Sequence, residues 1–207
     1  MFGRGVVAVV AATALLAIAG CSATPAQRAE GEPGPGIIAL KSTVEVQDYS
    51  LTIDDLAPVA EPTTVVLGDL NIDMSIEPHG LESNGDMSLP VSPFVAGWYE
   101  FGSAPDSRRG AIVLAAHVDS LAEGVGPFSR LKDAREGMTV EVEDDEGELH
   151  RYVVETVERI EKDEVDFDAV FTDQGETHLV LITCGGVWDR DRSSYTDNYI
   201  VTARPVT

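Results

Sequence analysis

Residues 178–189, HLVLITCGGVWD, constrain the fold more than any other stretch of the chain. The apolar run 179–182 has no polar interruption, which is typical of a strand buried on both faces. Gly185 and Gly186 are expected to end this strand, because glycine tolerates backbone angles that break one. Cys184 would then lie at the rim of a rigid sheet beside a loop, where a nucleophile is held firmly yet stays accessible. The alternative is a buried cysteine that acts as a small hydrophobic residue.

The remainder of residues 63–207 predicts an all-β domain. Apolar runs and alternating patterns separated by turn residues indicate about eight strands, which is typical of a closed barrel or a sandwich. Helix is expected only in a few short turns, near residues 128–135 and 167–171. The expected strands cover residues 64–72, with Gly68 inside, and residues 74–77, 95–101, 111–116, 138–143, 150–158, 180–183 and 199–203.

The N-terminal residues have the pattern of an export signal. Arg4 precedes an apolar run over residues 6–18, which is shorter than the roughly 20 residues of a membrane-spanning helix. Residues 18–21, IAGC, resemble a bacterial lipobox, in which the cysteine, here Cys21, is acylated. We therefore expect a signal peptide over 1–20, a lipidated N-terminus and flexible linker over 21–62, and one folded domain over 63–207. An ordinary signal peptide and an uncleaved signal anchor are the alternatives.

The two cysteines and the net charge limit the kinds of function that the chain can have. The chain has two cysteines, so a lipid on Cys21 leaves Cys184 unpaired, and a reactive thiol is a leading reason for an unpaired cysteine in an exported protein. A disulfide between the two is the alternative. The net charge is −22, from 14 Lys and Arg against 36 Asp and Glu, which argues against binding to nucleic acid and against electrostatic docking on anionic membranes.

His117 follows the apolar strand expected over residues 111–116, much as Cys184 follows its own strand. If the fold brings the two strand ends together, thiol and imidazole form the pair used in nucleophilic acyl transfer. The oxyanion of that reaction needs donors, either backbone N–H groups or an arginine such as Arg190 or Arg192, which otherwise are solvated loop residues. No set of ligands has zinc spacing and no glycine-rich phosphate loop precedes a helix, so we expect no metal and no cofactor.

Five segments together resemble the class F sortases of actinobacteria. They are 97–102 (GWYEFG), 111–120 (AIVLAAHVDS), 126–131 (GPFSRL), 181–186 (LITCGG) and 195–205 (YTDNYIVTARP). The resemblance implies an eight-stranded sortase β-barrel and a monomeric cysteine transpeptidase at the extracellular face of the membrane, held there by its lipid. Cys184 would attack an LPXTG-like C-terminal sorting signal of a secreted protein and form a thioester, which an amine of the cell wall or of a pilin resolves. His117 would protonate the leaving amine and deprotonate the incoming one.

One departure from that family bears on the chemistry. Many class F sequences carry an essential arginine at the position of Thr196. Arg192, or after it Arg190, is expected to reach in from the loop, unless backbone donors serve instead. A sortase barrel that has lost catalysis and acts as a surface binding lipoprotein is the second hypothesis. An L,D-transpeptidase ranks below both, because its Ser-x-Gly-Cys motif is absent and Thr183 directly precedes Cys184.

Overall fold

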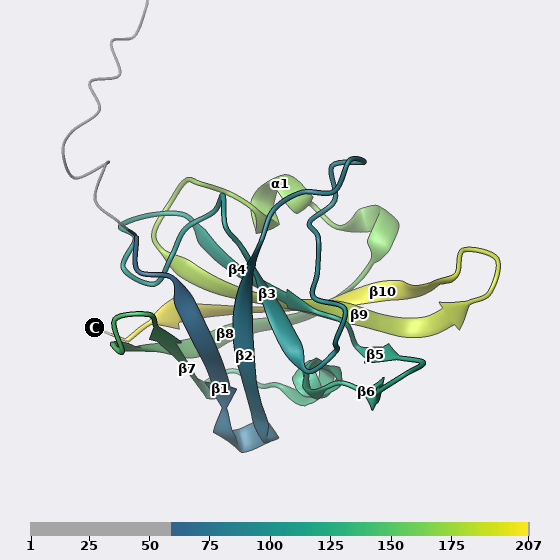
Figure 1. The fold of residues 1–207 in the computed structure, drawn as a ribbon, viewed down its shortest axis with the longest axis horizontal. Coiled ribbons are helices and arrows are strands. Elements are labelled where there is room, and N and C mark those ends of the chain that lie inside the picture. The colour runs from purple at the N-terminus through teal and green to yellow at the C-terminus, as the bar shows by residue number, and fades with distance from the viewer. Residues whose placement is uncertain (1–58, 207) are drawn as a thin grey trace, which may run out of the picture. The chain divides into compact units, whose positions relative to one another are not determined.

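The computed structural model describes residues 59–206 (Figure 1). The expected signal peptide, Cys21 and the linker up to residue 58 lie outside the described residues. In the part that is described, no helix combines the length and the hydrophobicity needed to cross a bilayer. The elements are β1 (Pro62–Leu67), η2 (Gly68–Leu70), β2 (Ile72–His79), β3 (Val95–Tyr99), β4 (Ala111–Ala116), β5 (Asp119–Ser120), β6 (Gly124–Val125), η3 (Pro127–Asp133), β7 (Thr139–Asp144), β8 (Leu149–Glu161), η4 (Lys162–Glu164), α1 (Phe167–Val170), β9 (His178–Asp189) and β10 (Ser194–Pro205).

Eight strands close into a barrel in the order β1-β2-β3-β4-β9-β10-β8-β7. The pairs β2–β3 and β4–β9 are parallel, and the other neighbours in the barrel are antiparallel. The remaining strands, β5 and β6, form a small separate ribbon. The all-β prediction is thus confirmed, and the barrel is realised rather than the sandwich.

The single strand expected over residues 64–72 is wrong. The chain leaves β1 at Gly68, makes one 3₁₀ turn and returns as β2, which pairs antiparallel with β1. Asn71 ends the turn in the left-handed conformation, with φ of 51°, and its backbone N–H donates to Gly68 O at 3.0 Å. Asparagine adopts these angles more readily than most residues, so an Asn rather than the glycine marks the reversal.

The expectation that Gly185 and Gly186 end a strand is also wrong. Strand β9 continues through them to Asp189 and forms a long hairpin with β10, which projects from the barrel in Figure 1. Gly186 and Val187 together face Thr196, so the glycines lie at a β-bulge. Gly186 has a φ of 80°, and a Cβ on Gly185 would collide with the ring of Tyr199. The glycines therefore permit a bulge and a close ring contact instead of ending the strand.

Strand β4 and residues 179–183 of β9 are buried on both faces, which explains the uninterrupted apolar runs 111–116 and 179–182. Alternate side chains enter two different hydrophobic clusters. One set faces the main barrel core, and the other faces an outer cluster that includes residues of the α1 segment. The inward set is Ile112, Leu114, Ala116, Leu179 and Leu181, and the outward set is Ala111, Val113, Ala115, Val180 and Ile182.

Asp144 organises the turn between β7 and β8. Its buried carboxylate accepts the backbone N–H groups of Glu146 and Glu148, at 3.0 and 2.8 Å, and faces His150 Nε2 at 2.7 Å. Burial alone would raise the pKa of Asp144, but the hydrogen bonds from His150, Glu148 and Glu146 outweigh it and hold this pKa below its usual value. Asp144, Glu148 and His150 are also close enough together to hold a metal ion. The bonds within the turn already account for their arrangement.

Replacement of Asp144 by Asn should lower stability in a pH-dependent way. The lowered pKa means that the carboxylate contributes stability above its unfolded pKa, and that this contribution disappears as the pH falls through its folded pKa. We expect Asp144→Asn to cost about 1–3 kcal/mol of unfolding free energy at pH 7, and the deficit to shrink below about pH 4. Urea unfolding at several pH values measures both, with the exposed Asp73→Asn as matched control. A deficit that is the same at pH 7 and pH 3 would contradict the assignment.

Candidate active site

The register of β4 and β9 brings the two candidate catalytic residues to the same edge of the sheet. Parallel pairing runs from Ala111 opposite His178 to Ala116 opposite Thr183. His117 and Cys184 are the next residues of the two segments, so the 67-residue separation in sequence equals the register offset of the pairing. The parallel pairing stops just before these two residues, and both of them line one cavity.

Thr183 fixes the junction just before the thiol. Its buried hydroxyl donates to Ala116 O at 2.7 Å, so the last residues of the β4–β9 pairing are joined by a side-chain bond as well as by the ladder. Because side chains alternate along a strand, Thr183 points inward and Cys184 points to the outer side, like Ile182. The Cys184 thiol is free and half-buried, and Cys184 lies opposite Asn198 in the β9–β10 register.

A first cavity, of about 510 Å³, opens on one side of the thiol. Its walls come mainly from the outer hydrophobic cluster and the segments that flank it, and they are predominantly apolar. The apolar and aromatic residues that line it are Leu81, Met87, Leu89, Tyr99, Ala115, Ala116, Phe167, Phe171 and Ile182. A cavity of this size and chemistry suits a short extended peptide with apolar side chains.

A second cavity, of about 810 Å³, lies on the other side and is more polar. Its lining includes His117, Asp119 and, from the β9–β10 hairpin, Trp188 and Tyr195. The Tyr195 hydroxyl donates to Asp119 Oδ2 at 2.6 Å, and Trp188 contacts the Tyr195 ring edge-on with centroids 5.2 Å apart. The bond to Asp119, then burial, raise the pKa of Tyr195 to about 12, so the phenol is a neutral donor at physiological pH.

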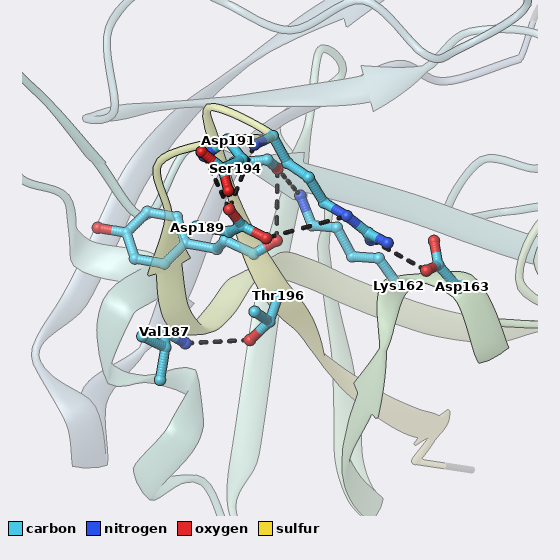
Figure 2. Close-up of polar contacts among 9 residues, drawn as sticks. Lys162, Asp163, Val187, Asp189, Asp191, Ser194 and Thr196 are labelled. Atoms are coloured by element: carbon cyan, nitrogen blue, oxygen red, sulfur yellow. Dashed lines mark hydrogen bonds and ion pairs between the residues drawn. The ribbon is translucent and has the colours of Figure 1, made fainter.

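Lys162 contacts the thiol, although its sequence context does not indicate a role at the site. Its Nζ donates to Cys184 Sγ at 3.4 Å and to Ser194 Oγ at 2.8 Å; Figure 2 shows the side chain directed at Ser194. Lys162 and Cys184 are the residues common to the linings of both cavities. Lys162 is one of three lysines in the chain and stands between Glu161 and Asp163, where it looks like part of a solvated charged surface. In the sequence, Lys162 is marked only by its position near the end of a long strand.

The two candidate arginines lie elsewhere. Arg192 is 60% exposed and pairs with Asp163 Oδ2 at 2.9 Å, while its Nε lies 3.9 Å from Asp189 Oδ2. The interaction with Asp163 contributes most to raising the pKa of the Arg192 guanidinium, and the charge of Asp189 adds to it. Arg190 is exposed. Neither arginine is among the residues that line the two cavities, so the structure does not bring them to the thiol.

Thr196 lies at the position where the resemblance leads one to expect an arginine. Its side chain stabilises the β-bulge instead. Its Oγ1 accepts the backbone N–H of Val187 at 3.1 Å (Figure 2). A hydrogen bond from its side chain and an ion pair with Arg159 hold the pKa of the buried Asp197 below its usual value. Thr196 and its neighbours are thus committed to holding the hairpin.

Comparison with solved structures finds sortases. Sortase C1 of Streptococcus agalactiae is 21% identical, with a TM-score of 0.54 over 70% of this chain and 66% of that one. Sortase C of Clostridium perfringens SM101 is 16% identical, with a TM-score of 0.51 over 76% of each chain. Sortase A of Corynebacterium diphtheriae is 14% identical, with a TM-score of 0.54 over 74% of this chain and 64% of that one. At these identities the likeness shows the fold, the eight-stranded sortase barrel.

Comparison with curated protein sequences returned no match. Comparison with family models matches the sortase domain over residues 69–206, well over half of the chain, and this range contains β2 to β10 with both His117 and Cys184. The chain therefore belongs to the sortase family.

Proposed function

We propose that this chain is a cysteine transpeptidase that cleaves an LPXTG-like sorting signal of a secreted protein and joins the new carboxyl end to an amine. The observation that carries the proposal is the β4–β9 register, because it aligns His117 with Cys184 at the boundary between two cavities. Transpeptidation needs one site for the acyl group and another for the amine, and the thiol is shared by both.

The first cavity supports an acyl-donor peptide that is apolar next to the scissile bond. Leu89, Phe171 and Ile182 offer apolar surface within one groove that ends at Cys184. The leucine and proline of an LPXTG-like signal would bury their side chains there, at about 25 cal/mol per Å² of apolar area removed from water. The rigidity of β9 would hold the thiol against the peptide carbonyl that follows these side chains.

The proposed reaction proceeds in two balanced steps. In the first, the proton of the Cys184 thiol passes to His117, Cys184 Sγ bonds to the peptide carbonyl carbon, the carbon–nitrogen bond breaks, and His117 gives that proton to the departing nitrogen. In the second, an amine nitrogen bonds to the thioester carbon, the carbon–sulfur bond breaks, and His117 takes the proton that this nitrogen loses. The second cavity, which His117 lines, would receive the departing amine and then the incoming one.

The subclass and the location are part of the same proposal. Class F membership rests on the five quoted segments, from residues 97–102 to 195–205. The lipobox-like residues 18–21 support attachment through Cys21 to the extracellular face of the membrane, where secreted substrates and amines of the cell wall or of pilins are available. We propose that the enzyme acts there as a monomer.

A binding lipoprotein with a sortase barrel is the second candidate, and Thr196 is the observation that favours it. The threonine leaves the usual arginine position without charge, and the nearest candidate arginines lie outside both cavities. Covalent chemistry at Cys184 distinguishes the two functions.

We predict that substitution of either catalytic residue stops peptide cleavage. The purified full-length chain in detergent would be mixed with a fluorogenic LPXTG-type peptide and an added amine. Cys184→Ala should abolish turnover and the thioester seen by mass spectrometry, because no nucleophile remains. His117→Ala should lower kcat/KM about 100- to 10,000-fold, the usual contribution of a general acid–base. His178→Ala, at the N-terminal end of β9, is the matched control.

Retained turnover in Cys184→Ala would overturn the mechanism. Absence of any adduct on the wild-type thiol with a panel of sorting motifs, despite a folded domain, would support the binding lipoprotein.

A second prediction concerns the anchor. Cys21→Ser should remove incorporation of labelled fatty acid in a Gram-positive host and shift the chain from the membrane fraction toward the medium or an unprocessed precursor, because the acylated sulfur is lost. Cys184→Ser, which leaves residues 18–21 intact, is the control. Labelling that persists in Cys21→Ser would exclude the lipid assignment.

A further inference from the structure

We propose that Lys162 is a catalytic residue that supplies the positive charge for the oxyanion formed at Cys184. The inference rests on the proposed function and deepens it. It starts from the contact of Lys162 Nζ with Cys184 Sγ at 3.4 Å. The carbonyl oxygen of a bound acyl group is two bonds away from that sulfur, so an ammonium that already contacts the sulfur is within hydrogen-bonding reach of the oxygen.

The sheet fixes the position of Lys162. Glu161, the last residue of β8, pairs with Asp197 of β10, which in turn pairs with Gly185 of β9. Lys162 follows Glu161, and the same register places it level with Thr196 of β10. Cys184 directly precedes Gly185 in β9. The end of the longest barrel strand thus delivers the ammonium to the thiol across two adjacent ladders.

The hydrogen bonds of Lys162 orient its ammonium group but use only two of its three donors. An ammonium has three donors, of which Ser194 Oγ receives one at 2.8 Å (Figure 2) and Cys184 Sγ receives another at 3.4 Å. The third remains for the oxygen of the substrate. Ser194 begins β10, so the hairpin that forms one wall of the second cavity also holds the amine in place.

The carboxylate of the neighbouring Asp163 is paired with another cation. Asp163 follows Lys162 and would compete for its charge, but Arg192 Nη1 binds Asp163 Oδ2 at 2.9 Å. The acid in the second cavity, Asp119, accepts the Tyr195 hydroxyl at 2.6 Å. Other ionisable side chains near the site are His117 in the second cavity and Asp86 and Asp168 in the first, and the exposed Glu161 precedes Lys162 in the chain.

The proposed step keeps the lysine proton on nitrogen throughout. As Cys184 Sγ bonds to the carbonyl carbon, the π electrons of the carbonyl move onto its oxygen, which accepts a hydrogen bond from the Lys162 ammonium. When the carbonyl reforms, the carbon–nitrogen bond breaks, and the leaving nitrogen takes its proton from His117. Lys162 therefore lowers the energy of the negatively charged intermediate and transfers no proton.

Single-turnover acylation of the full-length chain by the LPXTG-type peptide tests the proposal. Lys162→Met, which keeps the chain length and removes the charge, should slow acylation about 100- to 1,000-fold, the usual cost of one oxyanion donor. Lys162→Arg should retain activity within about tenfold of the wild type, because it restores the charge with a different donor geometry. The exposed Lys132→Met is the matched control, and thermal unfolding verifies that each variant folds.

Two further variants keep the test sharp. Ser194→Ala removes the bond that orients Nζ and should slow acylation by less than Lys162→Met does. Arg192→Ala should cost less than Lys162→Met as well, because the guanidinium binds an exposed carboxylate and not the thiol. Acylation by Lys162→Met within about threefold of wild type, or a larger loss in Arg192→Ala, would overturn the assignment.

Alkylation separates failure of this inference from failure of the proposed function. Anionic iodoacetate and neutral iodoacetamide both alkylate Cys184, and a neighbouring ammonium favours the anion. The iodoacetate-to-iodoacetamide rate ratio should fall in Lys162→Met and stay unchanged in Lys132→Met. If the wild type cleaves no peptide, the transpeptidase proposal fails, and a ratio that falls would still support a cation at the thiol. A ratio unaffected by Lys162→Met would overturn that cation in either case.

Discussion

The parallel pairing of β4 with β9 is the constraint on which the rest of the site depends. It is a long-range contact in the middle of the barrel, buried on both faces, and the hydroxyl of Thr183 closes it with a bond to Ala116 O at 2.7 Å. Burial on both sides prevents the two strands from sliding, since a one-residue slip would exchange the residues of the inner and outer clusters. The stability of the core and the alignment of His117 with Cys184 therefore have the same physical origin.

The outer cluster gives the barrel a second layer on the side of the thiol. Val180, Ile182 and Ile200 would face solvent in a bare barrel, but the segment that contains α1 covers part of them through Val170 and Phe171. The cover is incomplete, and the uncovered part is the apolar cavity that ends at Cys184. The same hydrophobic surface thus stabilises the fold and offers a place for an apolar peptide.

The sequence was most informative where local pattern and burial coincide. The apolar runs 111–116 and 179–182 predicted β4 and the buried part of β9, and the residues that follow them were recognised as candidates. The glycines after Cys184 were misinterpreted because a bulge depends on the partner strand, here on Thr196, and not on the glycines alone. Lys162 escaped notice for a similar reason: its neighbours in sequence are acidic, whereas its neighbours in space are a thiol and a hydroxyl. Interactions across ladders are not encoded in local periodicity.

The proposed role of Lys162, which follows β8 directly and lies level with Thr196 of β10, has a consequence for how sites of this kind are compared between relatives. What the chemistry requires is a charge at one point in space, and two strands, β8 and β10, lead to that point from different parts of the gene. On this proposal, a chain with a cation at the end of each strand would keep a charged site after losing either one. The absence of a charged residue from one position of the chain would then mark a relocation of the charge, and its replacement would be found on the neighbouring strand of the sheet.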